Sequence, residues 1–253
     1  MATAHEVDGM ERIFARPKAL EERRFHFCPG CGHSLSHRLV GEALDELEIV
    51  GQSIVIASVG CAYNIYDYLR CDGLHALHGR APAVATAVKL ALPHRLVFTY
   101  QGDGDLAAIG MAETVHAAAR GFNISIIFVN NAVYGMTGGQ MAPTTVLGQV
   151  TTTTGGGRDA ATAGFPIRVS EFLAGLDGPV YLERVALDTP ANVRRAKRAI
   201  LKSFQTQLAG KGFSLVEILS PCPPGWSCEP GEARGWLADN MLRTFPLGVF
   251  RDR

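Results

Sequence analysis

The sequence predicts an α/β protein built on a mostly parallel, doubly wound sheet with helices on both faces. Short runs of Val, Ile, Leu and Phe alternate along the chain with longer segments of helical periodicity, as in βαβ units. The runs are continuously apolar, which is typical of strands buried on both faces. Hydrophobic residues make up 47% of the 253 residues and charged residues only 19%. This balance favours a large buried sheet, a face covered by another subunit, or both.

Five segments are rich in β-branched or other apolar residues and are predicted to be buried strands. Because helical segments separate most of them, we expect crossover connections and therefore parallel pairing. The predicted strands are residues 53–58, 95–101, 123–130, 178–186 and 212–219.

Helical periodicity predicts five helices around these strands. Ser34 is a candidate N-cap of the first helix, and Pro93 and Gly121 end the second and third. Pro190 opens the fourth helix and Gly210 follows its last turn. The predicted helices are residues 34–48, 81–92, 106–121, 190–210 and 232–243.

Charge and composition exclude several classes of partner. The 24 Lys and Arg residues balance 24 Asp and Glu, and there is no long basic run, so nucleic acid is not expected. No apolar stretch is long enough to cross a membrane, and the N-terminus lacks the apolar core of a signal peptide. We therefore expect a cytoplasmic protein whose six cysteines serve in packing, a metal site or a cluster rather than in disulfides.

Polar residues follow two of the predicted strands at the edge of the sheet where ligands bind in such folds. The segment 102–105, Gly-Asp-Gly-Asp, follows one strand, and Asn130 and Asn131 follow the next. The glycines allow backbone amides to approach a phosphate, and Asp103 and Asn131 offer the hard oxygens that Mg²⁺ prefers. This pair of motifs resembles the thiamine diphosphate enzymes, whose pattern implies that the metal ligands are Asp103, Asn131 and the Val133 carbonyl.

Four cysteines are predicted to meet at the same edge. Cys28 and Cys31 form a CxxC before a helix, whereas Cys61 and Cys222 each follow a predicted strand. Four thiolates suit either a [4Fe–4S] cluster or a structural zinc ion, and their dispersed spacing favours neither metal. The remaining two, Cys71 and Cys228, are interpreted as inert packing residues.

Taken together, the motifs resemble the β subunit of the 2-oxoacid:ferredoxin oxidoreductases. The resemblance implies a thiamine diphosphate-binding fold with Mg²⁺ and one [4Fe–4S] cluster, held by Cys28, Cys31, Cys61 and Cys222. The sequence predicts a polar arm at 1–27, a cofactor domain at 28–225 and a C-terminal docking segment at 226–253. The matching stretches are CPGCGH (28–33), SVGC (58–61), HGRAPAVATAVKLA (78–91), YQGDGD (100–105), NNAVYGMTGGQMAPTT (130–145) and LSPC (219–222).

The resemblance also implies the reaction and its partners. The family oxidatively decarboxylates a 2-oxoacid, forms acyl-CoA from coenzyme A, and passes electrons through the cluster to ferredoxin. A partner α subunit supplies the glutamate that thiamine chemistry requires, so we expect this chain to be inactive alone, and small ferredoxin-like γ or δ subunits carry any further clusters. Gly138 stands where some relatives have lysine, which leaves 2-oxoglutarate and branched-chain acids such as 2-oxoisovalerate both open.

The expected site residues follow from this resemblance. His78 and Arg80 are candidate catalytic residues that face the cofactor or a substrate carboxylate, although with His75 they also fit a helix cap or a plain surface. The loop at 134–145 is expected to close on the diphosphate with Thr137 as a donor, rather than to be a simple flexible loop. The expected cofactor-binding residues are Gly32, His33, Gly60, Cys61, Gly102, Asp103, Gly104, Asp105, Asn131, Val133, Gly135, Met136 and Thr137.

Two other functions compete with this one. A non-redox thiamine diphosphate decarboxylase or synthase subunit with a structural zinc would use the same motifs. A non-enzymatic nucleotide-binding or scaffold subunit that kept the fold is the other alternative.

Overall fold

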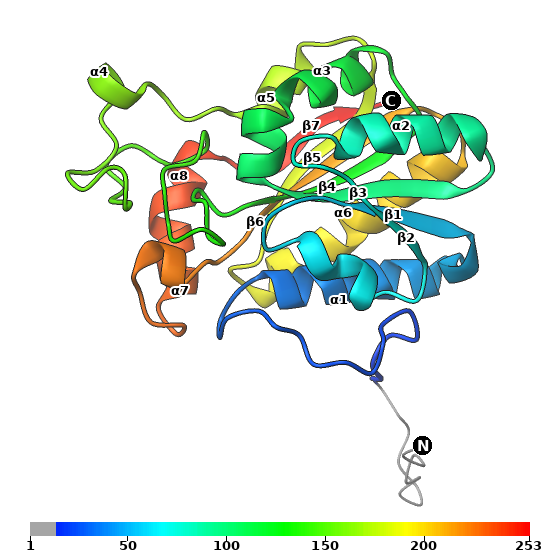
Figure 1. Cartoon of the computed structure of the whole chain (residues 1–253), viewed down its shortest axis with the longest axis horizontal. Helices are drawn as coiled ribbons and strands as arrows, with labels where there is room; N and C mark the ends of the chain where they lie inside the picture. Colours follow the sequence, from blue (N-terminus) through cyan, green and yellow to red (C-terminus); the bar gives the residue numbers. More distant parts are fainter. Residues whose placement is uncertain (1–13) are drawn as a thin grey trace, which may run out of the picture.

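Seven strands form one sheet in the computed structural model, which describes residues 14–253 (Figure 1). The strand order is β2-β1-β3-β4-β6-β5-β7, and every pairing is parallel except that of β7 with β5. This confirms the predicted fold class. The strands are β1 Ser53–Ala57, β2 Asp72–His75, β3 Leu96–Gly102, β4 Ser125–Asn130, β5 Pro179–Ala186, β6 Phe213–Leu219 and β7 Gly248–Asp252.

Helices cover both faces of the sheet (Figure 1). The longest two, α1 and α6, pack together on one face, and α2, α3 and α5 lie on the other. Two segments have π-helical hydrogen bonding, η3 (Asp105–Ile109) before α3 and η5 (Leu237–Met241) between α7 and α8. The helices are α1 His33–Glu46, α2 Ala81–Ala91, α3 Met111–Ala119, α4 Ala160–Ala163, α5 Val169–Ala174, α6 Pro190–Leu208, α7 Ala233–Trp236 and α8 Leu242–Thr244.

Strand β3, in the interior of the sheet, shows why these segments are apolar throughout. Phe98 and Tyr100 point to the core beneath α1 and α6, whereas Val97 points to the core beneath α2 and α3. All three side chains are fully buried. A strand covered on both faces has no solvent-facing side, so its sequence does not alternate.

Two strands were not predicted, and the ends of two helices differ from prediction. Strand β2 reads Asp-Gly-Leu-His and is exposed along its length, so its sequence lacks the apolar run of a buried strand. Strand β7 lies at the other edge of the sheet and is only partly buried, so it also lacks such a run. The N-cap prediction at Ser34 is wrong, because α1 begins at His33 after Gly32, which makes no side-chain cap. The predicted helix at 106–121 begins instead with the π-helical segment η3.

The N-terminal arm is partly described, since residues 1–13 lie outside the described residues. Beyond them the chain packs on α1, where Leu20 is buried and contacts Gly41. The Asp45 carboxylate accepts hydrogen bonds from the Lys18 and Ala19 amides, at 2.5 and 2.9 Å. From residue 14 onward, no helix is long and apolar enough to cross a membrane.

One buried cation contacts the C-terminal segment, which also pairs with the sheet through β7. Arg184 of β5 is fully buried and pairs with Glu217 of β6 at 2.9 Å and with Glu171 of α5. Its guanidinium also lies 5.3 Å from the centre of the Phe245 ring and 4.9 Å from that of Phe250. Cation–π contacts of this kind are strongest where water is absent. The predicted division at residues 28–225 and 226–253 stays a prediction.

Candidate functional site

Four neighbouring strands, β1, β3, β4 and β6, end at one edge of the sheet, and their following loops carry the predicted site. The strand order reverses direction at β1, the position where ligands bind in doubly wound sheets. Every predicted cofactor residue except Gly32 lines a single cavity there. The lining residues are His33, Val59, Gly60, Cys61, His78, Gly102, Asp103, Gly104, Asp105, Asn131, Val133, Tyr134, Gly135, Met136 and Thr137.

The three predicted Mg²⁺ ligands lie together in this cavity. The Val133 amide is 3.3 Å from Asp103 Oδ2 and 3.2 Å from Asn131 Oδ1. Burial raises the pKa of Asp103 to about 6, although hydrogen bonds from Thr144 and from the amides of Gly104, Val133 and Asn131 oppose the rise. A buried carboxylate of this kind is stabilised by a cation. The contact shown is with the Val133 amide, so a role for its carbonyl stays a prediction.

This donor set fits Mg²⁺ bound together with a phosphate ligand. Among residues 14–253, no group of three His, Cys, Asp or Glu side chains lies close enough to hold one metal ion. Mg²⁺ bound through one or two carboxylates takes its other ligands from phosphate oxygens and water. Asp103 and the Asn131 amide oxygen are therefore sufficient as side-chain ligands beside a diphosphate.

The carboxylate of Asp105, a predicted cofactor residue, accepts hydrogen bonds from other residues of the chain. Its Oδ1 accepts hydrogen bonds from the Ser58 hydroxyl and the Gly79 amide, each at 2.7 Å, and its Oδ2 accepts one from Gln101 at 2.5 Å. His78 Nδ1 also pairs with Oδ1. Asp105 therefore ties together the loops after β1, β2 and β3 and orients the imidazole of His78.

The two candidate catalytic residues have different surroundings. His78 lines the cavity, and its contact with Asp105 through Nδ1 leaves Nε2 as the nitrogen available to a ligand. Arg80 does not line the cavity and pairs with Glu113 of α3. His75 is exposed and lies edge-on to Tyr63, with ring centres 5.0 Å apart.

The four predicted cluster cysteines gather beside the same cavity. A Cβ placed on Gly135 would lie 3.1 Å from Cys222 Sγ and 3.9 Å from Cys61 Sγ. The CxxC is held there by Gly32, whose amide donates to the Pro221 carbonyl at 3.0 Å. A side chain on Gly32 would come within 2.2 Å of Ser220 Oγ, so only glycine allows this approach.

Burial and neighbouring cysteines raise the pKa of two of the predicted cluster ligands. Burial raises the pKa of Cys31 to about 11, and the nearby Cys61 and Cys28 raise it further. Burial likewise raises the pKa of Cys222 to about 12, with Cys31 and Cys61 adding to the effect. The buried thiols of Cys31 and Cys222 therefore favour the neutral form, and their thiolates require a compensating positive charge. The four sulfurs do not lie close enough in this structure to hold a single metal ion. Four thiolates are the ligand set of a [4Fe–4S] cluster and of a structural zinc ion.

Comparison with known proteins places this site in a family. Residues 50–218 match the model of the thiamine pyrophosphate enzyme C-terminal TPP-binding domain. The chain is 37% identical, over 85% of its length, to the 2-oxoglutarate synthase subunit KorB of Methanocaldococcus jannaschii, of which it covers 78%. It belongs to the thiamine diphosphate-binding subunits of the 2-oxoacid:ferredoxin oxidoreductases. The predicted family is therefore confirmed.

The chain is also similar to a longer relative and to a solved structure. The subunit is 48% identical, over 97% of its length, to the ketoisovalerate oxidoreductase subunit VorA of Methanothermobacter marburgensis, but it spans only 52% of that protein. A solved structure of 2-oxoglutarate:ferredoxin oxidoreductase from Magnetococcus marinus, with 2-oxoglutarate, coenzyme A and succinyl-CoA bound, superposes with a TM-score of 0.76. The identity is 25%, and the match covers 98% of the subunit and 87% of that chain.

Several residues of the subunit's site were not predicted from sequence. Thr144 donates to Asp103 at 2.8 Å, and the Tyr100 hydroxyl bonds His33 Nδ1 at 3.0 Å. Trp226 donates its indole N–H to the Asn131 carbonyl at 2.8 Å and so fixes the loop after β4. Thr144 lies within the quoted loop 134–145, but nothing in its spacing distinguishes it from the neighbouring threonine.

Proposed function

We propose that the subunit holds thiamine diphosphate, Mg²⁺ and one [4Fe–4S] cluster in an enzyme that oxidatively decarboxylates a 2-oxoacid. The products are CO₂ and, with coenzyme A, an acyl-CoA, and the electrons leave through the cluster to ferredoxin. The observation that carries the proposal is Gly135, which lines the cofactor cavity and lies next to Cys61 and Cys222. One backbone segment thus separates the carbon chemistry from the electron acceptor.

Each group of residues has a separate task in this proposal. Bound thiamine diphosphate supplies the carbon nucleophile and the electron sink that allow a 2-oxoacid to lose CO₂. Asp103 and Asn131 hold Mg²⁺ beside the diphosphate, and the short loop at 102–104 brings backbone amides close to it. Asp105 orients His78 so that its Nε2 can donate to, or accept from, the reacting molecule. Cys28, Cys31, Cys61 and Cys222 hold the cluster.

The substrate is proposed from the relatives. Identity is higher to the ketoisovalerate subunit VorA, at 48%, than to the 2-oxoglutarate subunit KorB, at 37%. This order favours a branched-chain 2-oxoacid, with 2-oxoglutarate as the second candidate. A panel of 2-oxoacids assayed in the complete complex, with viologen reduction as the readout, distinguishes them through kcat/KM.

The cluster is tested with matched cysteine variants. Cys28→Ser and Cys222→Ser should lose iron and acid-labile sulfide after anaerobic reconstitution, from about four of each per chain in the wild type. Thiamine diphosphate binding should persist while ferredoxin reduction stops. Cys71→Ser and Cys228→Ser, which alter cysteines outside the proposed ligand set, serve as controls and should keep both. Zinc without sulfide in the wild type would instead identify a structural zinc site.

Cofactor binding and the need for a partner are tested separately. Equilibrium dialysis with thiamine diphosphate and Mg²⁺ should show binding by the wild type and none by Asp103→Ala; absence of binding by either would favour a scaffold role. We also propose that the partner α subunit supplies the catalytic glutamate. Decarboxylation by the isolated chain would therefore contradict this part of the proposal.

A further inference from the structure

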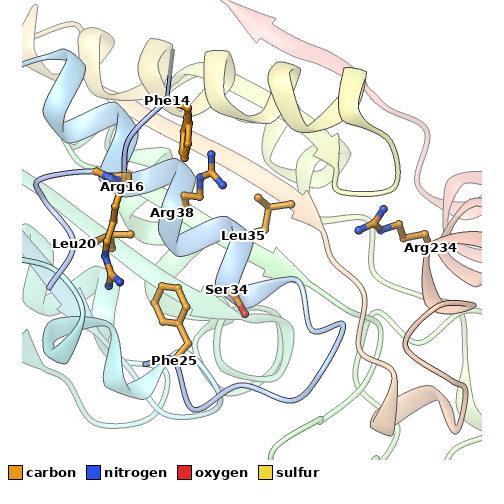
Figure 2. A pocket seen from close by; sticks show the side chains of 9 residues that line it. Phe14, Arg16, Leu20, Phe25, Ser34, Leu35, Arg38 and Arg234 are labelled. Atoms are coloured by element: carbon orange, nitrogen blue, oxygen red, sulfur yellow. The ribbon is translucent and has the colours of Figure 1, made fainter. Parts of the chain in front are cut away.

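A second cavity, of about 510 Å³, opens on the surface beside α1 (Figure 2). Its lining contains three arginines and no acidic residue, although the chain as a whole has no net charge. We call it the arginine pocket. Its lining residues are Phe14, Arg16, Pro17, Leu20, Phe25, Ser34, Leu35, Arg38 and Arg234.

Two of the arginines have no carboxylate partner within the described part of the chain. Arg16 donates to the backbone carbonyls of Glu21 and Arg23 and makes no salt bridge among residues 14–253. Arg234 of α7 is exposed and makes no salt bridge with any residue from 14 to 253. Arginine is the side chain best suited to bind carboxylates in a fixed geometry.

The third arginine is held in place. Arg38 of α1 pairs with Glu42 at 2.8 Å, and its guanidinium lies 4.1 Å from the centre of the Phe14 ring. Leu20, Phe25 and Leu35 lie near Arg16 and Arg38, with Leu20 buried and Phe25 half-buried, whereas Arg234 lies apart on the other side of the pocket (Figure 2). An apolar floor with arginines at its rim is the composition of a protein-docking surface rather than of a site for a free ion.

The arginine pocket borders the cysteine group. Ser34 and Leu35, which line it, belong to the first turn of α1, directly after the CxxC. The Phe25 ring lies 5.8 Å from that of Phe27, and the Phe27 ring stacks on His33 at 5.2 Å. Phe27 immediately precedes Cys28, which is exposed. The exposed edge of the proposed cluster and the pocket therefore lie on adjoining surface.

We propose that the arginine pocket is the docking surface for an acidic one-electron carrier protein of the ferredoxin class. This inference rests on the proposed function, because it requires a cluster at the four cysteines. On docking, the carrier's carboxylates pair with Arg16, Arg38 and Arg234, and one electron passes from the reduced cluster to the oxidised carrier. The cluster is thereby oxidised by one electron and the carrier reduced by one, with no bond made or broken. Complementary charge acts mainly on the rate of encounter and weakens with salt.

The test uses the complete complex with two electron acceptors. An acidic 2[4Fe–4S] ferredoxin probes the docking surface, and methyl viologen, a small dication, probes cluster reduction alone. The variants are Arg234→Gln and the double variant R38Q/R234Q. Arg120→Gln is the matched control, since Arg120 is exposed and follows α3 on the opposite face of the sheet (Figure 1).

We expect the KM for ferredoxin to rise about threefold in Arg234→Gln and about tenfold in the double variant, because removed charges slow steered association. The fall of kcat/KM with rising salt should become shallower in both variants. Viologen reduction and the Arg120→Gln control should stay within twofold of the wild type.

Several outcomes would overturn the inference. An unchanged KM for ferredoxin in the double variant, with viologen reduction intact, would mean that the carrier docks elsewhere. Loss of complex assembly in size-exclusion chromatography would mean that the pocket binds a partner subunit instead. Because Arg234 makes no salt bridge in the described chain, Arg234→Gln alone keeps the test valid if the double variant fails to fold. A wild-type complex that reduces neither acceptor would refute the proposed function, a result distinct from failure of the docking surface.

Discussion

Replacing Gly104 by alanine should weaken thiamine diphosphate binding through one side-chain contact. Gly104 has helical backbone angles, with φ of −65° and ψ of −33°, so alanine fits its backbone. Its Cβ, however, would lie 2.0 Å from Tyr134 Cε1, 2.5 Å from Cδ1 and 2.8 Å from Cζ. Carbon atoms pack at about 3.5 Å or more, so the ring must move by roughly 1.5 Å.

The direction of that movement sets the size of the effect. Tyr134 lines the cofactor cavity, and its backbone pairs with Gln140 and Gly139 at 3.0 and 2.9 Å, which holds the base of the loop. Because Tyr134 lines the cavity, a ring pushed away from Gly104 toward the cavity competes with the diphosphate for space. Overpacking costs about 1–3 kcal/mol, which here reduces affinity by about 5- to 150-fold. The free energy of unfolding without cofactor should change much less.

Isothermal titration calorimetry with Mg²⁺ present measures the affinity, and urea unfolding measures the stability. Gly235→Ala is the matched control, because a Cβ there meets nothing within 4 Å. The double variant G104A/Y134V removes the clashing ring atoms and should bind about as well as Tyr134→Val alone, as a double-mutant cycle reports. A dissociation constant for Gly104→Ala within twofold of the wild type would refute the reasoning.

Three other predictions concern buried polar groups. Arg184→Met leaves Glu217 buried without its cation and should lower the free energy of unfolding by about 3–5 kcal/mol in urea titrations. Adding Glu217→Gln should restore part of the lost stability. If the effects of the two substitutions simply add, the ion pair between Arg184 and Glu217 does not stabilise the fold. Thr144→Val removes a hydrogen bond to the Asp103 carboxylate and should weaken Mg²⁺-dependent cofactor binding about tenfold in dialysis, whereas Thr144→Ser should not. Burial, with a smaller effect of His33, lowers the pKa of His37 to about 3, below its ordinary value of 6.5. His37 therefore stabilises the fold above pH 6.5 and loses that contribution as the pH falls toward 3, by about 2 kcal/mol between pH 7 and 5. His37→Gln should remove this contribution to the loss of stability between pH 7 and 5. If the variant loses as much unfolding free energy over that range as the wild type, the prediction is wrong.

Most of the fold and the composition of the cavity could be predicted because both depend on local signals. Strands buried on both faces have continuous apolar sequences and are easily recognised. Because parallel strands end at one edge of a sheet, Asp103 and Asn131 could be placed together from the sequence alone. Short exposed strands carry no such signal. Strand β2 contains a single large apolar residue, Leu74, and pairs with β1 alone in the sheet.

The roles of individual side chains were harder to predict because they depend on contacts between distant segments. Asp103 and Asp105 follow the same strand and both line the cavity, but hydrogen bonds from Ser58 and Gly79 occupy the Asp105 carboxylate. Arg80 pairs with Glu113 on the next helix. Neither partnership has a spacing that sequence periodicity reveals, since each depends on how two loops or helices pack.

The spread of the four cysteines along the chain has a consequence for biosynthesis. Cys28 lies near the start and Cys222 follows β6, a strand that inserts between β4 and β5. Chains emerge from the ribosome N-terminus first, so three thiols are made well before the fourth. The proposed set of four cysteine ligands is complete only after β6 has been translated and has entered the sheet. Insertion of the proposed cluster would therefore have to follow the addition of β6, and a chain that stalls before Cys222 would offer only three of the four proposed ligands.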